Sequence, residues 1–249
     1  MRTSLVMADP FRKFLLLNLV SGGAVLFAVL SFSLFREQRY RGHYLSLANK
    51  TDYFRVMHNQ AAKKLDNMLR AESESIKYLR ATLLQPLRGR VLEVAVGSAP
   101  NLPHYSAEVD LVGLDWSPRM LELAREKAKG RVKLVEGDLC RLPFEDSSFD
   151  AVVCTFGLCS TLQPMQALAE MRRVVKSEGL VVLLEHGAAD SWYESWQLRL
   201  SHYKDLCTSG CNNNQDVDQM VLASGLHIVQ RWREDKGRIY AYTLKPNKS

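Results

Sequence analysis

The sequence predicts an α/β protein with a doubly wound, mainly parallel seven-stranded sheet whose last strand is antiparallel, preceded by a transmembrane helix. Short apolar runs alternate with helical patterns from residue 89 onward, which is typical of a parallel sheet with helices on both faces. Two strand-like runs near the C-terminus predict an antiparallel pair. With 249 residues, 47% hydrophobic and 24% charged, the chain allows one sizeable domain plus an appendage, and collagen-like, disordered and disulfide-scaffold classes are excluded.

The predicted membrane span, Phe14–Phe35, contains 22 residues without a charge. At about 1.5 Å per residue such a helix covers roughly 33 Å, which exceeds the hydrocarbon core of about 30 Å. A cleaved signal peptide is one alternative, but its apolar region should be only about 7–15 residues long. A buried core helix is the other, and the sequence offers no second apolar run to cover it. We therefore expect residues 1–40 to form a retained anchor.

The positive charge of the chain lies in its N-terminal third. Residues 1–90 contain 15 Lys and Arg against 6 Asp and Glu, whereas residues 91–249 contain 18 against 21. A nucleic-acid enzyme usually has its basic patch around the active site, so we expect no nucleic-acid partner. The basic stretch after the span favours the cytosolic or matrix side for the globular part, and it is equally compatible with an ordinary solvated helix face. Residues 41–87 are expected to form a basic helical linker or cap, with helical spacing over Thr51–Leu84.

The remaining elements follow from local patterns. Five strands are expected at Arg90–Val96, Leu111–Asp115, Val132–Glu136, Phe149–Cys154 and Leu180–Glu185. The C-terminal pair is expected at Leu226–Trp232 and Arg238–Leu244. Ser117 followed by Pro118 is a strong helix start, because serine caps the first turn and proline fits its first position. A further helix is expected over Pro164–Lys176, ending near Gly179.

Acidic residues end three successive strands. Glu93 lies inside the first strand, Asp115 ends the second and Asp138 follows the third. In open parallel sheets, ligands bind at the carboxyl ends of the strands, and an acidic residue after the second strand can accept the hydroxyls of a ribose. Asp138 is placed to accept the amino group of an adenine. Together the three residues predict an adenosine site.

At these positions the sequence resembles the class I S-adenosylmethionine-dependent methyltransferases. The likeness covers about residues 88–245 and includes the blocks LDWSPRML, EGDLCRLPFEDSSFDAVVCTFGLC and AEMRRVVKSEG. The family's Glu/Asp-x-Gly-x-Gly-x-Gly loop corresponds here to Glu93, Ala95, Gly97 and Ala99. Alanine replaces glycine cheaply only where φ is negative. The resemblance implies a Rossmann-like methyltransferase domain over residues 88–249, with S-adenosylmethionine as cofactor. It assigns cofactor binding to Glu93, Ala95, Gly97, Asn101, Asp115, Trp116, Asp138, Leu139 and Thr155.

Further blocks resemble a group of small membrane-anchored methyltransferase-like proteins. GSAPNLPHY, LLEHGAA and SGCN carry this likeness. The group includes alkyl-thiol methyltransferases of the endoplasmic reticulum and mitochondrial inner-membrane proteins; ubiquinone/menaquinone C-methyltransferases are a more distant likeness. The resemblance implies a single-pass membrane enzyme of one of these two membranes, acting on a small apolar or amphipathic acceptor such as a thiol, a quinol or a lipid-like molecule.

One other function remains open, and a third is disfavoured by the sequence. Because alanine stands at Ala95 and Ala99, the chain is alternatively a catalytically weak methyltransferase-like protein that serves as an assembly or scaffold factor. A Rossmann dehydrogenase needs a glycine-rich turn running directly into a helix, and Pro100 and Pro103 interrupt that turn.

His186 is the candidate catalytic residue. It follows the fifth strand, where an acceptor would lie, and an imidazole can deprotonate a thiol or hydroxyl. A structural histidine that fixes the loop is the alternative. Glu185 is a candidate for orienting His186, although adjacent residues of a strand point to opposite faces.

A stripe of apolar residues lies at helical spacing between the fifth and sixth strands, at Trp192, Trp196, Leu200 and Tyr203. It is expected to belong to the core, with a lid over the acceptor or a membrane contact as alternatives. The five cysteines show no zinc-binding spacing, so no metal is expected, and reduced thiols are favoured over a Cys207–Cys211 disulfide.

Overall fold

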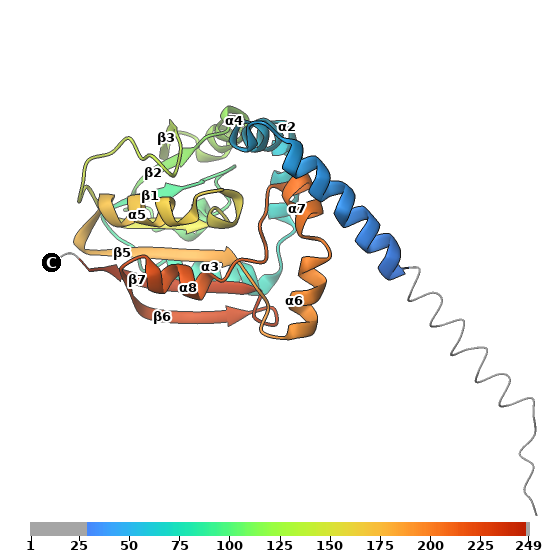
Figure 1. Cartoon of the computed structure of the whole chain (residues 1–249). Helices are drawn as coiled ribbons and strands as arrows, with labels where there is room; N and C mark the ends of the chain where they lie inside the picture. The colour runs from blue at the N-terminus through green and yellow to red at the C-terminus, as the bar shows by residue number, and fades with distance from the viewer. Residues whose placement is uncertain (1–28, 248–249) are drawn as a thin grey trace, which may run out of the picture.

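The computed structural model describes residues 29–247, and within them a seven-stranded sheet forms the centre of the molecule (Figure 1). The strand order is β3-β2-β1-β4-β5-β7-β6. The strands are β1 (Arg90–Val94), β2 (Asp110–Asp115), β3 (Val132–Glu136), β4 (Phe149–Thr155), β5 (Val175–His186), β6 (Leu226–Glu234) and β7 (Ile239–Pro246). Strands β1 to β5 pair in parallel, and β7 lies antiparallel to both β5 and β6. The predicted sheet is therefore confirmed, including its antiparallel last strand.

Apolar side chains cover both faces of the sheet. Leu92 and Val94 of β1 belong to one buried cluster, together with helices α5 (Pro164–Val174) and α8 (Val217–Ala223). Val91 of β1 belongs to the other cluster, which includes residues of α3 (Glu74–Leu84) and α4 (Pro118–Ala128). Because successive residues of a strand point to opposite faces, a strand buried on both sides reads as a continuous apolar run.

Some boundaries differ from the sequence prediction. Helix α5 ends at Val174, not at Lys176, and β5 begins at Val175 and pairs with Phe149 of β4 before the register shifts. Strand β1 ends at Val94 because Ala95 turns into the left-handed region with φ of 52°. The N-terminal boundary of α4 is confirmed, since the Ser117 hydroxyl accepts a hydrogen bond from the Met120 N–H.

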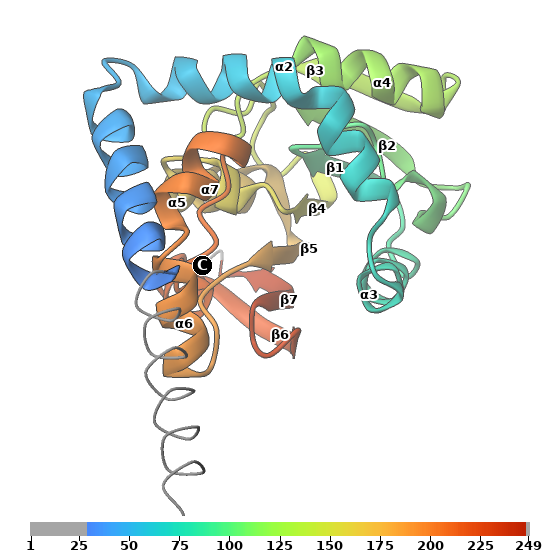
Figure 2. The ribbon, with the colours of Figure 1, turned by 90° about the vertical axis from the view of Figure 1, so that its right-hand side faces the viewer.

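The helical N-terminal region is split into three parts. Residues 29–46 are helical, α2 covers Lys50–Arg70, and α3 begins after Ser73, whose hydroxyl accepts from the Ile76 N–H. Figure 2, which looks at the carboxyl edge of the sheet, shows α2 crossing this edge. Among the described residues, no helix is both long and apolar enough to cross a membrane. Most of the predicted span, residues 14–28, lies outside the described residues.

The stripe predicted between β5 and β6 is divided over two short helices. Helix α6 (Trp192–Arg199) ends before Ser201, and α7 (His202–Ser209) follows. Trp192 is 81% exposed and Trp196 40% exposed, so the expectation of a core stripe is wrong for these side chains. The helix is interrupted at residues 200–201, so the four residues do not lie on one continuous helix.

Candidate active site

A cavity of about 600 Å³ opens at the carboxyl ends of the strands. Residues at the ends of β1, β2, β4 and β5 form its floor, and α2 and α3 contribute an apolar wall. The wall residues of α2 and α3 include Leu65, Met68, Leu69, Ile76 and Arg80. This volume is in the range of small-molecule and cofactor sites, and the position is the one at which doubly wound sheets bind ligands.

The loop after β1 is held in a left-handed backbone conformation at three alternate positions. The φ angles are 52° at Ala95, 55° at Gly97 and 57° at Ala99. Glycine adopts this conformation freely, whereas for alanine it costs about 1–2 kcal/mol. The loop thus retains the backbone shape of a glycine-rich loop while two of its positions carry the strain of a Cβ.

Asp115 at the end of β2 connects this loop to α4. Its carboxylate accepts hydrogen bonds from the Gly97 N–H at 2.8 Å and from the Ser117 N–H at 2.9 Å. Asp115 is 7% exposed, and burial raises its pKa to about 6 although these N–H donors oppose the shift. A carboxylate oxygen has more than one acceptor site, so the buried group lining the cavity still fits a ribose hydroxyl.

A polar network that begins in the cavity wall and continues into the core was not predicted from the sequence. Arg80 of α3 donates two hydrogen bonds to the carboxylate of Glu72, at 2.9 and 2.6 Å. The same guanidinium donates to the side-chain oxygens of Asn101 and Thr155. Arg80 is 1% exposed, so this one side chain connects the N-terminal helices to the loop after β1 and to the end of β4.

Glu93 continues the network into the sheet. Its carboxylate accepts from the amide of Asn101 and from the hydroxyl of Tyr105, both at 2.8 Å. Full burial raises the pKa of Glu93 to about 7, against the effect of these donors and of Arg80. Glu93 therefore supports the loop from below the cavity. It does not line the cavity wall.

Seven of the predicted site residues line the cavity together: Ala95, Gly97, Asp115, Trp116, Leu139, Thr155 and His186. Glu93 and Asn101 lie beneath it in the network. Within the described chain, Asp138 is exposed and outside the cavity wall, and its carboxylate accepts from the Cys140 N–H at 2.8 Å. The wall still fits S-adenosylmethionine, because it combines the buried carboxylate of Asp115 with the apolar side chains of Trp116 and Leu139.

His186 lies at the far end of the cavity, at the carboxyl end of β5. Its ring stacks on Phe156 with a centroid distance of 4.3 Å, and its Nδ1 faces the thiols of Cys159 and Cys211. Phe156 itself has φ of 56°, an uncommon conformation for a bulky residue that is often found at functional sites. The sequence pattern did not predict that these two cysteines meet His186.

Glu185 is turned away from His186, as the alternation along a strand requires. Its carboxylate accepts hydrogen bonds from the backbone N–H groups of Gly157, Leu158 and Cys159, at 3.1 to 3.4 Å. Glu185 therefore holds the loop after β4 and does not orient the His186 ring.

Comparisons with known proteins identify the family of the chain. The model of the methyltransferase domain family matches residues 92–183. A demethylmenaquinone methyltransferase of Deinococcus radiodurans is 46% identical over 102 residues, which cover 39% of this chain and 42% of that protein. A phosphatidylethanolamine N-methyltransferase of Cereibacter sphaeroides is 30% identical over 176 residues, covering 68% of this chain and 86% of that protein.

The fold is also found among solved structures. A Thermotoga maritima protein described as a SAM-dependent methyltransferase, possible histamine N-methyltransferase, superposes with a TM-score of 0.61. The identity is 18%, and the match covers 77% of this chain and 99% of that chain. The family model and the relatives indicate a methyltransferase that uses S-adenosylmethionine, and the solved structure shares the fold. The chain belongs to the class I S-adenosylmethionine-dependent methyltransferases.

Proposed function

We propose that this protein transfers a methyl group from S-adenosylmethionine to a small apolar or amphipathic acceptor, such as a thiol, a quinol or a lipid-like molecule, at a membrane surface. The observation that carries the proposal is the wall of the cavity. Leu65, Met68, Leu69 and Ile76 of α2 and α3 face the same space as Asp115 and Thr155. An acceptor that buries apolar surface against these side chains gains about 25 cal/mol per Å².

The cofactor supplies an activated methyl group on its sulfonium, so the chain mainly has to hold and orient the two reactants and exclude water. Asp115 is proposed to hold the ribose, and Trp116 and Leu139 to enclose the adenine. Arg80 fixes the wall that the acceptor contacts. His186, at the opposite end of the cavity, is proposed as the catalytic residue on the acceptor side.

The relatives support this class of acceptor through their names, which refer to demethylmenaquinone and phosphatidylethanolamine. Both are amphipathic molecules of a membrane. The chain spans 42% of the first relative, so the identity of the acceptor is argued here from the cavity and not transferred from that protein.

Attachment to the membrane through residues 14–35 is part of the proposal. Helix α6 lies near the beginning of the helix 29–46 in both views (Figures 1 and 2). Its aromatic side chains Trp192, Tyr193 and Trp196 are exposed, and Val29 and Phe32 on the other helix are more than half exposed. Aromatic residues with one apolar and one polar side are enriched at membrane interfaces. We propose that these two helices contact the same membrane.

The catalytic proposal is tested with full-length protein, methyl-labelled S-adenosylmethionine, and a panel of alkyl thiols, quinols and phosphatidylethanolamine vesicles. Label is expected in at least one of these classes with wild-type protein. Asp115→Asn keeps a polar group of the same size but loses the charge, and should reduce transfer at a subsaturating cofactor concentration. No transfer to any of the three classes would refute the proposed function.

The membrane proposal has its own test. Val25→Lys places a charge in the middle of the uncharged run, at a cost of about 3 kcal/mol for insertion. Wild-type protein should stay with membranes through a carbonate wash, and the variant should be released in part. A wild-type protein that is washed off completely would contradict the anchor. Fluorescent full-length protein, compared with markers of the endoplasmic reticulum and the mitochondrial inner membrane, separates the two proposed locations.

The second candidate function is that of an assembly or scaffold factor. It is favoured by the backbone strain at Ala95 and Ala99 in the loop that would contact the cofactor. Calorimetric titration with S-adenosylmethionine distinguishes the two. The enzyme requires saturable binding in the micromolar range, and a scaffold that has lost the cofactor shows none at millimolar concentration.

A further inference from the structure

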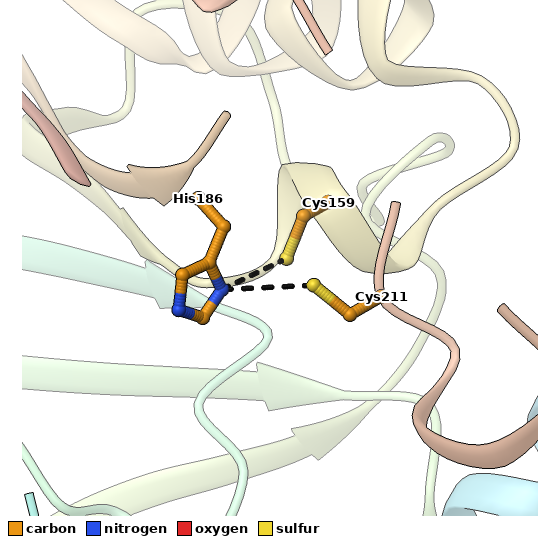
Figure 3. Close-up of side chains that lie close together, drawn as sticks. All are labelled: Cys159, His186 and Cys211. Carbon is orange, nitrogen blue, oxygen red and sulfur yellow. Dashed lines mark hydrogen bonds between the residues drawn. The ribbon is translucent and has the colours of Figure 1, made fainter. Parts of the chain in front are cut away.

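Two thiols and an imidazole from three separate segments meet in the wall of the cavity. Figure 3 shows the three side chains. Cys159 belongs to the short 3-10 helix Leu158–Ser160 after β4, His186 ends β5, and Cys211 follows α7. Their side chains converge on one point, with both sulfurs directed at Nδ1 of His186. The three donor atoms lie within 4.8 Å of one another.

The two distances between nitrogen and sulfur in this cluster match the edge of a zinc coordination tetrahedron. Nδ1 of His186 is 3.8 Å from Sγ of Cys159 and 3.6 Å from Sγ of Cys211. With Zn–S of about 2.3 Å and Zn–N of about 2.0–2.1 Å, a tetrahedral angle places sulfur and nitrogen about 3.6 Å apart. The three donor atoms, which lie within 4.8 Å of one another, are therefore close enough to share one Zn²⁺ once the two sulfurs approach to about 3.8 Å.

The segments that carry the ligands are held to one another before any metal binds. The Asn212 N–H donates to the Cys159 carbonyl at 2.6 Å, which ties the segment of one cysteine to that of the other. Glu185 accepts from the Cys159 N–H and its two preceding neighbours, as described above. The Gln215 side chain donates to the Leu158 carbonyl at 3.3 Å. These hydrogen bonds fix the backbone of the segments that carry Cys159 and Cys211 relative to each other.

We propose that Cys159, His186 and Cys211 bind one Zn²⁺ ion, with the fourth coordination position open to the cavity. All three residues line the cavity, and Cys159 is buried whereas the other two are partly exposed. A site with three protein ligands and an accessible fourth position is the arrangement of catalytic zinc, whereas structural zinc has four protein ligands. The site could not be recognised from the sequence, because its three ligands are 25 to 52 residues apart and do not form a short zinc-binding motif.

The open position suits a thiol acceptor, and this part of the inference rests on the proposed function. Coordination to zinc deprotonates a thiol, and the proton leaves to solvent. The sulfur then uses its electron pair to bond the methyl carbon while the carbon–sulfur bond of the sulfonium breaks. The products are a thioether and S-adenosylhomocysteine, and the metal is not oxidised or reduced. His186 serves here as a ligand that positions the metal.

Metal binding is tested without reference to activity. Purified full-length protein, reduced and freed of metal with a chelator, is titrated with Zn²⁺ and separately with Co²⁺. We expect one ion per chain, and for Co²⁺ the strong thiolate charge-transfer absorption and the visible bands of a tetrahedral complex. Cys159→Ser and Cys211→Ser should weaken binding by at least about 100-fold, more than the loss of a supporting hydrogen bond.

Cys140→Ser is the matched control, because Cys140 is partly buried but lies outside the cavity wall. It should bind metal like wild type. Circular dichroism of each variant in chelator shows whether it folds, and Zn²⁺ should raise the melting temperature of wild type and Cys140→Ser only. A wild-type chain that binds no zinc would overturn the inference, as would unchanged binding in Cys159→Ser or a Cys159–Cys211 disulfide in freshly purified protein.

The fourth position is tested with the Co²⁺ form. Adding a short alkyl thiol should increase the charge-transfer absorption, and the alcohol of the same chain length should leave it unchanged. An unchanged spectrum with thiol would show that the position is closed. Methyl transfer that persists in chelator would refute the catalytic role of the metal and leave the proposed function standing. Zinc binding without methyl transfer to any acceptor would refute the proposed function and leave the metal site standing.

Discussion

Arg80 offers a direct test of the buried network, because it joins the N-terminal helices to the cofactor edge of the sheet. Arg80→Met keeps an unbranched apolar side chain but leaves the carboxylate of Glu72, whose side chain is 11% exposed, without its bidentate partner. Breaking a buried ion pair from one side costs about 3–5 kcal/mol. For a chain of this size that corresponds to a loss of about 6–20 °C in melting temperature.

The assay is urea unfolding followed by circular dichroism at neutral pH. Arg88→Met makes the same chemical change at an exposed arginine four residues past the end of α3, and it should stay within about 0.5 kcal/mol of wild type. The double variant Arg80→Met/Glu72→Met removes both charges and should be more stable than Arg80→Met alone. A cost below about 1 kcal/mol for Arg80→Met, or a double variant no more stable than the single one, would refute the reasoning.

Three further predictions concern the cofactor loop and its supports. Ala95→Gly relieves left-handed strain and should stabilise the protein by up to about 1 kcal/mol. Gly97→Ala, whose added Cβ would meet only a carbonyl oxygen at 4.0 Å, should destabilise it by about 1–2 kcal/mol. Destabilisation by Ala95→Gly or stabilisation by Gly97→Ala in urea unfolding would contradict the loop geometry. Burial raises the pKa of Glu93 from 4.5 to about 7, so the folded protein keeps this proton up to about pH 7. The raised pKa contributes up to about 3 kcal/mol to the free energy of unfolding at acidic pH, and this contribution is lost as the pH rises from 4.5 to 7. Glu93→Gln should flatten this decline when unfolding is measured near pH 5 and pH 7.5. Asp115→Asn should lower cofactor affinity at least about tenfold in calorimetry, because a charge-assisted hydrogen bond is worth about 1.5–3 kcal/mol, and unchanged affinity would assign the ribose to another residue.

Local patterns in the sequence predicted the parallel sheet, its antiparallel last strand and the edge of the sheet at which the cavity opens. Apolar alternation, the Ser117 cap and the acidic residue at the end of β2 are local signals, and each depends on neighbours within a few residues. They were enough to predict the parallel strands, the antiparallel end and the position of Asp115, but not the order of the strands in the sheet. They were less accurate at Val175, where pairing with β4 extends the strand into residues with a helical pattern.

Which side chains contact one another in the site could not be predicted from the sequence and is seen only in the folded chain. Arg80 reaches Asn101 and Thr155 across 21 and 75 residues, and the spacing of a single helix contains no information about such partners. The contact of His186 with Cys159 and Cys211 likewise arises from strand order and from a loop after α7. Local propensity determines helices and strands because their hydrogen bonds are short-range in sequence, whereas buried polar partners are selected by packing, which compensates the cost of removing each of them from water.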